Sequence, residues 1–267
     1  KTLYIENNLT SEKISKSTLK TISTLLPRGT IHFFGSESYI ADISNALGKQ
    51  YTILDSDRIA QNIKSSDLIT KPYDNWFNMP FSVRISLIRR VVLVGPESVG
   101  KSTLAKNLQR YLVKEPFLPE YGRTYETFRD PGPYKDKEFY TIVETQAAHR
   151  TALLPFSGPI FIEDTDELVT SVWVEMLLNK KIQKIENQIN LPHLYLLMDP
   201  SVPFTNEEIR YFNGQKRIDF YNKLERKLEF YDASFQVLTG TWEDRETEAR
   251  KIIKSLLSEK PGWSELR

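Results

Sequence analysis

The sequence predicts an α/β fold in which a doubly wound parallel sheet follows a smaller, Rossmann-like part. Three observations carry this prediction. Four strongly apolar segments alternate with helical segments after residue 86. A glycine-rich loop joins the first of these strands to its helix, and a shorter strand–helix–strand pattern occupies the beginning of the chain. We therefore expect two domains, residues 1–86 and residues 87–267.

In the first part, the pattern favours two short strands with a helix between them. We expect the strands at 29–36 and 51–57. Apolar residues recur at helical spacing over 38–48, and Gly48 is a typical helix end. The segment 70–84 contains prolines and aromatic residues, and we interpret it as a linker or a docking segment.

In the second part, strands and helices alternate regularly. The main strands are expected at 89–95, 158–167, 191–200 and 234–241, and a short one is formed by "PFLP". One helix should follow the first strand over 101–113. Another, over 214–231, should bury Ile218, Tyr221, Leu224 and Leu228.

The composition excludes several classes of protein. The 267 residues are 40% hydrophobic and 27% charged, with a formal net charge of +1, so general attraction to nucleic acid or anionic lipid is not expected. There is no cysteine, which rules out a disulfide scaffold and a thiol nucleophile. No apolar run approaches the ~18 residues of a membrane span. We expect a cytoplasmic protein without nucleic-acid or membrane partners. A segment before Lys1 and a homo-oligomeric state are both left open.

The most specific motif is "GPESVGKST", which lies between an apolar strand and a helix. Its two glycines, its lysine and the following serine satisfy G-x-x-x-x-G-K-[ST]. Backbone N–H groups of such a loop surround phosphates, the lysine reaches the outer phosphates, and the serine hydroxyl binds Mg²⁺. The residues expected to contact ATP here are Gly95, Glu97, Ser98, Val99, Gly100, Lys101, Ser102 and Thr103.

Two acids follow the strand over 158–167. A phosphate-binding loop needs an acid at a neighbouring strand end to hold the metal ion. We predict Asp164 for the metal, or for accepting the proton of a substrate hydroxyl, and Asp166 for a substrate hydroxyl. The alternative is that these acids only cap the next helix.

The rest of the motif inventory favours phosphoryl transfer to a small molecule. A GTPase would need a D-x-x-G switch and an N-K-x-D base reader, and the nearest match, "NKLE", lies inside a helix. The polar stretch "PFTNEEIRYFNGQKR" carries Arg210 and Arg217 and suits a lid that excludes water and brackets the transferred phosphoryl group.

Two further clusters complete the predicted site. In "EYGRTYE", Glu120, Tyr121 and Arg123 could bind the phosphate acceptor, although Arg123 could equally pair with Glu120. In "TGTWEDR", Trp242 or Arg245 could stack on the nucleotide base, and core packing is as good an explanation of Trp242. The three histidines are scattered and are interpreted as structural.

In order along the chain, "GPESVGKSTLAKNL", "EYGRTY", "IEDTD", "PFTNEEIRYFNGQKR" and "WEDR" resemble the nicotinamide riboside kinase domain of NadR-type proteins. The resemblance covers about residues 86–256. It implies a P-loop kinase that transfers the ATP γ-phosphate to the 5′-hydroxyl of nicotinamide riboside, giving nicotinamide mononucleotide. It also implies that Lys101 and Ser102 hold ATP and Mg²⁺, that Asp164 and Asp166 serve catalysis and the riboside, and that the two arginines belong to the lid.

The resemblance extends upstream, with departures. NadR-type proteins carry an adenylyltransferase domain before the kinase, and "FFGSESY", "LDSDR" and "PYDNW" resemble its second half. Its H-x-G-H signature is absent from this chain. Where a later signature carries an arginine for the ATP phosphates, Ile69 stands. We therefore expect a partial or degenerate nucleotidyltransferase-like domain without that activity.

The residues alone leave two alternatives to nicotinamide riboside phosphorylation. One is a P-loop kinase of another nucleoside. The other is a regulatory sensor that binds ATP without turnover, a role that requires neither the acid pair nor the lid arginines.

Overall fold

The structure of the chain, a computed structural model, describes residues 16–26, 29–60, 62–112, 116–201 and 214–258. The chain divides into two compact units, Lys1–Thr70 and Lys71–Arg267. The division lies ahead of the residue 86 expected from the sequence. The reason is Trp76, which is 3% exposed and donates its indole N–H to the Ser157 carbonyl at 2.9 Å inside the second unit.

The first unit contains a small parallel sheet. Strands β1 (His32–Gly35) and β2 (Gln50–Ile53) pair in parallel, with His32 opposite Gln50, and helix α2 (Tyr39–Ala46) connects them. This is the strand–helix–strand pattern read from the sequence. Helices α1 (Lys16–Leu25) and α3 (Ser65–Thr70) complete the unit as far as it is described.

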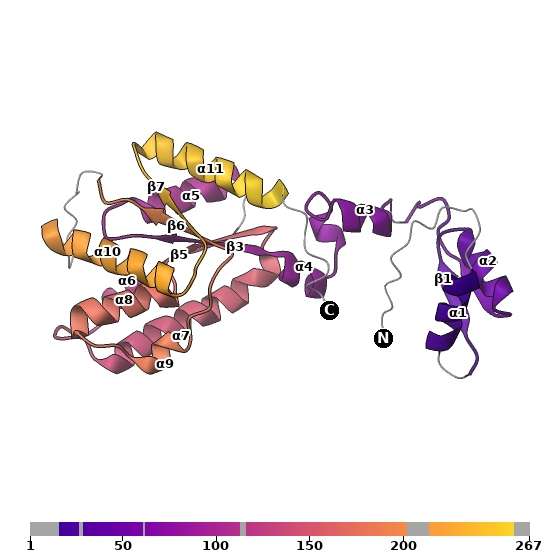
Figure 1. The fold of residues 1–267 in the computed structure, drawn as a ribbon, viewed down its shortest axis with the longest axis horizontal. Coiled ribbons are helices and arrows are strands. Elements are labelled where there is room, and N and C mark those ends of the chain that lie inside the picture. Colours follow the sequence, from indigo (N-terminus) through magenta and orange to yellow (C-terminus); the bar gives the residue numbers. More distant parts are fainter. Residues whose placement is uncertain (1–15, 27–28, 61, 113–115, 202–213, 259–267) are drawn as a thin grey trace. The chain divides into compact units, whose positions relative to one another are not determined.

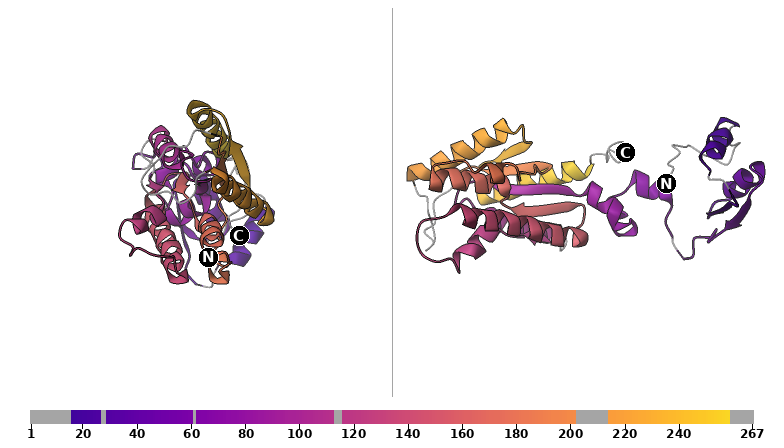
Figure 2. Two further views of the ribbon diagram at one scale, coloured as in Figure 1. Left: turned by 90° about the vertical axis from the view of Figure 1, so that its left-hand side faces the viewer. Right: turned by 90° about the horizontal axis from the view of Figure 1, so that it is seen from below.

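The second unit is a five-stranded parallel sheet with helices on both faces, as expected (Figure 1, Figure 2). The strand order is β4-β5-β3-β6-β7. The strands are β3 (Arg89–Val94), β4 (Phe117–Leu118), β5 (Ile160–Asp164), β6 (Leu194–Met198) and β7 (Phe235–Leu238). The helices are η1 (Trp76–Asn78), α4 (Phe81–Leu87), α5 (Lys101–Tyr111), α6 (Tyr121–Glu126), α7 (Asp136–Leu153), η2 (Leu154–Phe156), α8 (Glu167–Leu178), α9 (Gln183–Glu186), α10 (Gly214–Phe230) and α11 (Trp242–Ser258).

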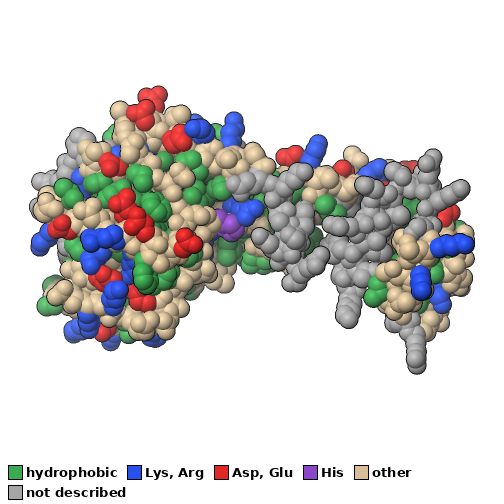
Figure 3. Space-filling model, viewed as in Figure 1, with side chains coloured by type: hydrophobic (Ala, Val, Ile, Leu, Met, Phe, Trp, Pro, Cys, Tyr) green, Lys and Arg blue, Asp and Glu red, His purple; other side chains and the backbone are tan. Residues whose placement is uncertain are grey.

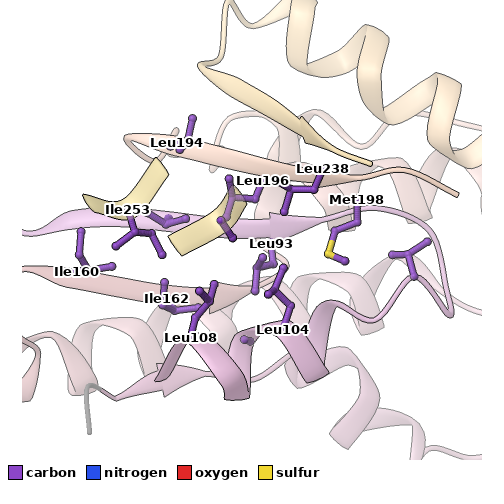
Figure 4. Packing of buried hydrophobic residues seen from close by; sticks show 14 residues of the cluster. Leu93, Leu104, Leu108, Ile160, Ile162, Leu194, Leu196, Met198, Leu238 and Ile253 are labelled. Atoms are coloured by element: carbon purple, nitrogen blue, oxygen red, sulfur yellow. The ribbon is translucent and has the colours of Figure 1, made fainter. Parts of the chain in front are cut away.

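Alternate residues of the central strand β3 fill two separate cores. Val91 and Leu93 pack with side chains of α5 and α11 on one face (Figure 4). Val92 and Val94 pack with side chains of α8 and α10 on the other. Because both faces are buried, β3, β5 and β6 each contain an unbroken apolar run, over 91–94, 160–162 and 194–198, and such runs are typical of central parallel strands.

Helix α10 differs from the expected helix in its buried face. Leu224 and Leu228 are buried as predicted, but Ile218 is 44% exposed and Phe220 takes the core position. Arg217 is also buried, because its guanidinium reaches main-chain carbonyls beyond the helix. The buried face of α10 thus includes the polar Arg217, and the spacing of apolar residues alone could not predict this.

The face of the second unit seen in Figure 3 carries no dominant charge. Acidic and basic side chains are interspersed over the visible face of the second unit (Figure 3). Among the described residues, no helix combines the length and the apolar character needed to cross a membrane.

Candidate functional site

The loop between β3 and α5 has the backbone conformation of a phosphate-binding loop. Gly95, Ser98 and Gly100 have φ angles of 144°, 59° and 83°. The two glycine positions also leave no room for a side chain, since a Cβ on Gly95 would lie 2.8 Å from the Met198 carbonyl oxygen. The loop opens at the N-terminus of α5, where unpaired N–H groups and the helix dipole favour an anion.

Lys101 lies inside this loop. Its Nζ donates to the carbonyl oxygens of Gly95 at 3.0 Å and Pro96 at 2.8 Å. The side chain is buried, and burial lowers the pKa of the ammonium despite the attraction of Asp164 and Glu120. The loop therefore holds a cation where the outer phosphates of a nucleotide would lie.

Ser102 and Asp164 form the second element of the site. The Ser102 hydroxyl donates to Asp164 Oδ2 at 2.5 Å. Asp164 is 1% exposed, and its Oδ1 has no hydrogen-bond partner among the described residues. A buried carboxylate oxygen without a partner is costly unless a ligand satisfies it.

These two oxygen donors fit Mg²⁺, which binds proteins through one or two carboxylates and completes its shell with phosphates and water. Within the described part of the chain, no group of three or more His, Cys, Asp or Glu side chains could hold a metal ion.

Asp166 lies two residues further on but in different surroundings. Thr165, with a φ of 61°, separates the two acids. Asp166 Oδ1 accepts the N–H groups of Leu168 and Val169, and Oδ2 accepts the Tyr195 hydroxyl at 2.6 Å. Burial, with the nearby Glu167 and Glu163, raises the pKa of Asp166 to about 7. Asp166 thus caps α8, which is the alternative role considered from the sequence, and its contact with a substrate hydroxyl stays a prediction.

The residues of "EYGRTYE" approach the loop from β4 and α6. Burial and the charge of Asp164 raise the pKa of Glu120, and Lys101 and Arg123 oppose that rise. Glu120, Asp164 and Lys101 therefore share one electrostatic environment. The Arg123 side chain is 57% exposed and lies 3.9 Å from Glu120, so the structure contains the pair considered from the sequence. Tyr121 packs edge-on against His149, with 5.5 Å between ring centroids.

Of the two arginines predicted to belong to a lid, Arg217 contacts the phosphate-binding loop and Arg210 lies outside the described residues. The Arg217 Nε donates to the Glu97 carbonyl at 2.9 Å, and Nη1 donates to the Pro200 carbonyl at 2.9 Å. Arg217 thus links α10 to the phosphate-binding loop and to the end of β6.

A pocket of about 390 Å³ adjoins the loop on the α11 side. Trp242 is half-exposed at its rim and lies over Gly100, where an added Cβ would meet its Cζ3 at 2.2 Å. Arg245 lies beneath and is 1% exposed; it bonds the Gly240 carbonyl and lies 3.9 Å from Asp199. Trp242 and Arg245 both line this pocket, and stacking of Trp242 on a nucleotide base stays a prediction.

The sequence patterns did not predict a cluster of buried polar side chains from α7 that contacts Glu163, the residue before Asp164. Arg150 forms three hydrogen bonds with Glu163 and an ion pair with Glu167 at 2.8 Å. Gln146, one turn earlier on α7, donates to Glu163 at 3.2 Å. Polar residues four apart on an otherwise apolar helix face were the available signal, because long polar side chains are buried only with partners.

Comparisons with known proteins agree with this architecture. Residues 90–245 match the profile of the AAA domain. The trifunctional NAD biosynthesis/regulator protein NadR of Salmonella typhimurium strain LT2 is 22% identical over 221 residues, which are 80% of this chain and 53% of that protein. The chain thus spans about half the length of the curated relatives that it matches.

Two solved structures share the fold. The structure of NadR protein in complex with NR has a TM-score of 0.64 and 21% identity, covering 90% of this chain and 72% of the other. The structure of NadR protein in complex with NAD and AMP-PNP gives the same score and identity over 90% and 71%. At these identities the likeness establishes the fold.

Proposed function

The chain belongs to the AAA domain family, and we propose that its second unit is an ATP-dependent kinase of nicotinamide riboside. The product would be nicotinamide mononucleotide. The observation that carries the proposal is the contact between Ser102 and Asp164, which joins the phosphate-binding loop to a strand-end acid beside Lys101 and Glu120. A regulatory sensor that only binds ATP does not need a second carboxylate, such as Glu120, beside the phosphate-binding loop.

In this proposal, catalysis consists of positioning and charge neutralisation, as phosphoryl transfer requires. The loop N–H groups bind the phosphates, and Lys101 leaves the Gly95 and Pro96 carbonyls to contact the transferred group. Ser102 and Asp164 would hold Mg²⁺, which supplies charge neutralisation to the phosphate oxygens when bound. Arg217 fixes the loop from α10 through the Glu97 carbonyl.

Glu120 is the carboxylate best suited to receive the acceptor's hydroxyl proton. Asp164 accepts the Ser102 hydroxyl, whereas Glu120, among the described residues, bonds neither Ser102 nor Asp164, and its pKa is raised. A carboxylate whose pKa is raised toward neutral is a better general base than an ordinary one. The proton would pass to Glu120 as the 5′-oxygen attacks the γ-phosphorus, and ADP would leave.

The choice of nicotinamide riboside rests on resemblance. The motif series matches the family's series, and one solved structure with the same fold is that of NadR protein in complex with NR. The choice of ATP as the phosphate donor draws on a second structure, that of NadR protein in complex with NAD and AMP-PNP, an ATP analogue. We extend the proposal to residues 1–70 by assigning them no adenylyl transfer, because the expected arginine is replaced by Ile69, which is 44% exposed on α3.

The test is an ATP-coupled assay across nicotinamide riboside, adenosine, cytidine and thymidine. The proposal expects turnover with nicotinamide riboside and a kcat/KM at least about tenfold lower for each of the others. Preference for another nucleoside would leave a P-loop kinase with a different acceptor. ATP binding without turnover on any nucleoside would favour the sensor and reject the kinase.

A further inference from the structure

Gln146 contacts two parts of the site through the two ends of its side-chain amide: the segment that carries Glu120 and Tyr121, and the end of β5 that carries Asp164. Its Oε1 accepts the backbone N–H of Tyr121 at 2.9 Å. Its Nε2 donates to Glu163 Oε1 at 3.2 Å and to the Thr165 carbonyl at 3.4 Å. The residue is 4% exposed, so water does not compete strongly for these bonds.

The orientation of this amide is fixed by its partners. Tyr121 N–H can only donate, and the carboxylate of Glu163 and the carbonyl of Thr165 can only accept. A flipped amide would place an oxygen against two acceptors and an NH₂ group against a donor. One orientation therefore satisfies all three partners and the other satisfies none.

The contact with Tyr121 has a local reason. Tyr121 is the first residue of α6, and the first N–H groups of a helix have no partner within the helix. The N-cap residue Glu120 provides no side-chain cap. Gln146 supplies one from α7, and His149 adds its ring contact with Tyr121 one turn along the same helix.

The contacts with Glu163 and Thr165 hold the other part, the end of β5, because these residues flank Asp164 on either side. Glu163 keeps three hydrogen bonds to Arg150 without Gln146, so the end of β5 does not depend on Gln146 for its fold. What Gln146 adds is a fixed separation between the Glu120–Tyr121 backbone and the Asp164 strand end.

We propose that Gln146 is a positioning residue that sets the distance between the acceptor wall, Glu120 and Tyr121, and the metal wall at Asp164. This inference rests on the proposed function, in which the acceptor hydroxyl lies between these walls. Reacting groups must be held close to their productive geometry, and an error of about 1 Å costs up to about a hundredfold in rate. Nucleotide binding, which uses the loop and α11, does not pass through Gln146.

The test is Gln146→Met, which keeps the length of the side chain and removes the amide. The control is Gln183→Met, at an exposed position of α9 where the side-chain amide donates to Asn187 Oδ1 on the same surface. For Gln146→Met we expect kcat/KM for the nucleoside to fall by tenfold to about a hundredfold, while the Kd for ATP stays within about twofold. The control should match the parent protein in both measurements.

Hydrogen exchange separates this inference from the proposed function. In Gln146→Met the Tyr121 amide should exchange faster, whether or not any nucleoside is phosphorylated. Unchanged exchange and unchanged kcat/KM would overturn the inference. An equal fall in ATP affinity and nucleoside turnover would also overturn it, since that marks a purely structural role. If Gln146→Met does not fold, the same measurements are made on Gln146→Asn. If Gln146→Asn also fails to bind ATP, Gln146 serves the fold alone and the inference is overturned. Absence of turnover in the parent protein rejects the kinase and leaves the exchange result to decide the positioning contact.

Discussion

The Ser102 hydroxyl donates a 2.5 Å hydrogen bond to Asp164, connecting the first turn of α5 to the last residue of β5. The two residues are far apart in sequence and meet because β3 and β5 are neighbours, with Leu93 opposite Asp164. In parallel sheets, the carboxyl ends of adjacent strands form one ligand-binding edge.

Asp164→Asn tests whether this contact belongs to the active site. The amide removes the charge that would hold the metal, so we expect kcat to fall by at least about a hundredfold with the fold retained. Asp166→Asn is the matched control. Asparagine is as good an N-cap as aspartate, so that variant should keep turnover of the same order. Equal loss in both variants would contradict the different roles assigned to the two acids.

Gly100→Ala should damage the nucleotide site through two effects. The residue has a φ of 83°, and a Cβ would meet Trp242 Cζ3 at 2.2 Å. We expect a loss of about 1–2 kcal/mol in stability and weaker ATP binding, measured by thermal unfolding and calorimetry. Gly132→Ala shares the positive φ, at 135°, but its Cβ meets no atom within 4 Å, so ATP affinity should be unchanged. Equal ATP affinities in the two variants would argue against a nucleotide site at Gly100.

Arg217→Lys should reduce catalysis although it preserves the charge. A lysine ammonium cannot span the Glu97 and Pro200 carbonyls as a guanidinium does, so the phosphate-binding loop loses its link to α10. Steady-state kinetics should show kcat/KM for ATP falling by about tenfold or more. Arg226→Lys, an exposed position on the same helix, should have no such effect. Parent-like kinetics in Arg217→Lys would show that the link is dispensable.

Stability should depend on pH through Glu175. Burial alone would raise the pKa of Glu175, but hydrogen bonds from Lys227 and Lys223 outweigh it and place the pKa below the usual 4.5. The folded state therefore gains stability from this carboxylate above pH 4.5, and the gain is lost as the pH falls through the lowered pKa. Glu175→Gln should cost about 1–2 kcal/mol at pH 7 in denaturant unfolding, and less as the pH approaches 3. A cost that does not vary with pH would contradict the ionic origin of the stabilisation.

Local sequence patterns were sufficient for the sheet and the phosphate-binding loop. Strands such as 89–94 are apolar on both faces, and the glycine spacing of the loop has one common structural solution, so neither depends on distant partners. The different contacts of the Asp164 and Asp166 carboxylates could not be predicted in this way. They follow from the left-handed Thr165, a conformation that threonine seldom adopts, and from Tyr195 on another strand.

The polar connections behind the site were equally hidden. Gln146 and Arg150 belong to a helix whose partners lie on β5 and α6, and no spacing rule joins residues across such separations. Arg217 has the same explanation, since its partners are main-chain carbonyls that carry no sequence signal. Motifs identify groups that are close in sequence, whereas the relative placement of the walls is set by tertiary packing.

The measurement that tests the central claim most directly is ATP-dependent phosphorylation of nicotinamide riboside by the parent protein and by Lys101→Ala. The Lys101 ammonium donates to the carbonyls of Gly95 and Pro96, so its removal should lower the thermal midpoint somewhat, and the midpoint is measured to establish that the variant is folded. The account predicts nicotinamide mononucleotide from the parent protein and none above background from a folded Lys101→Ala variant. Retained phosphorylation in that variant, or no transfer by the parent protein, would contradict it.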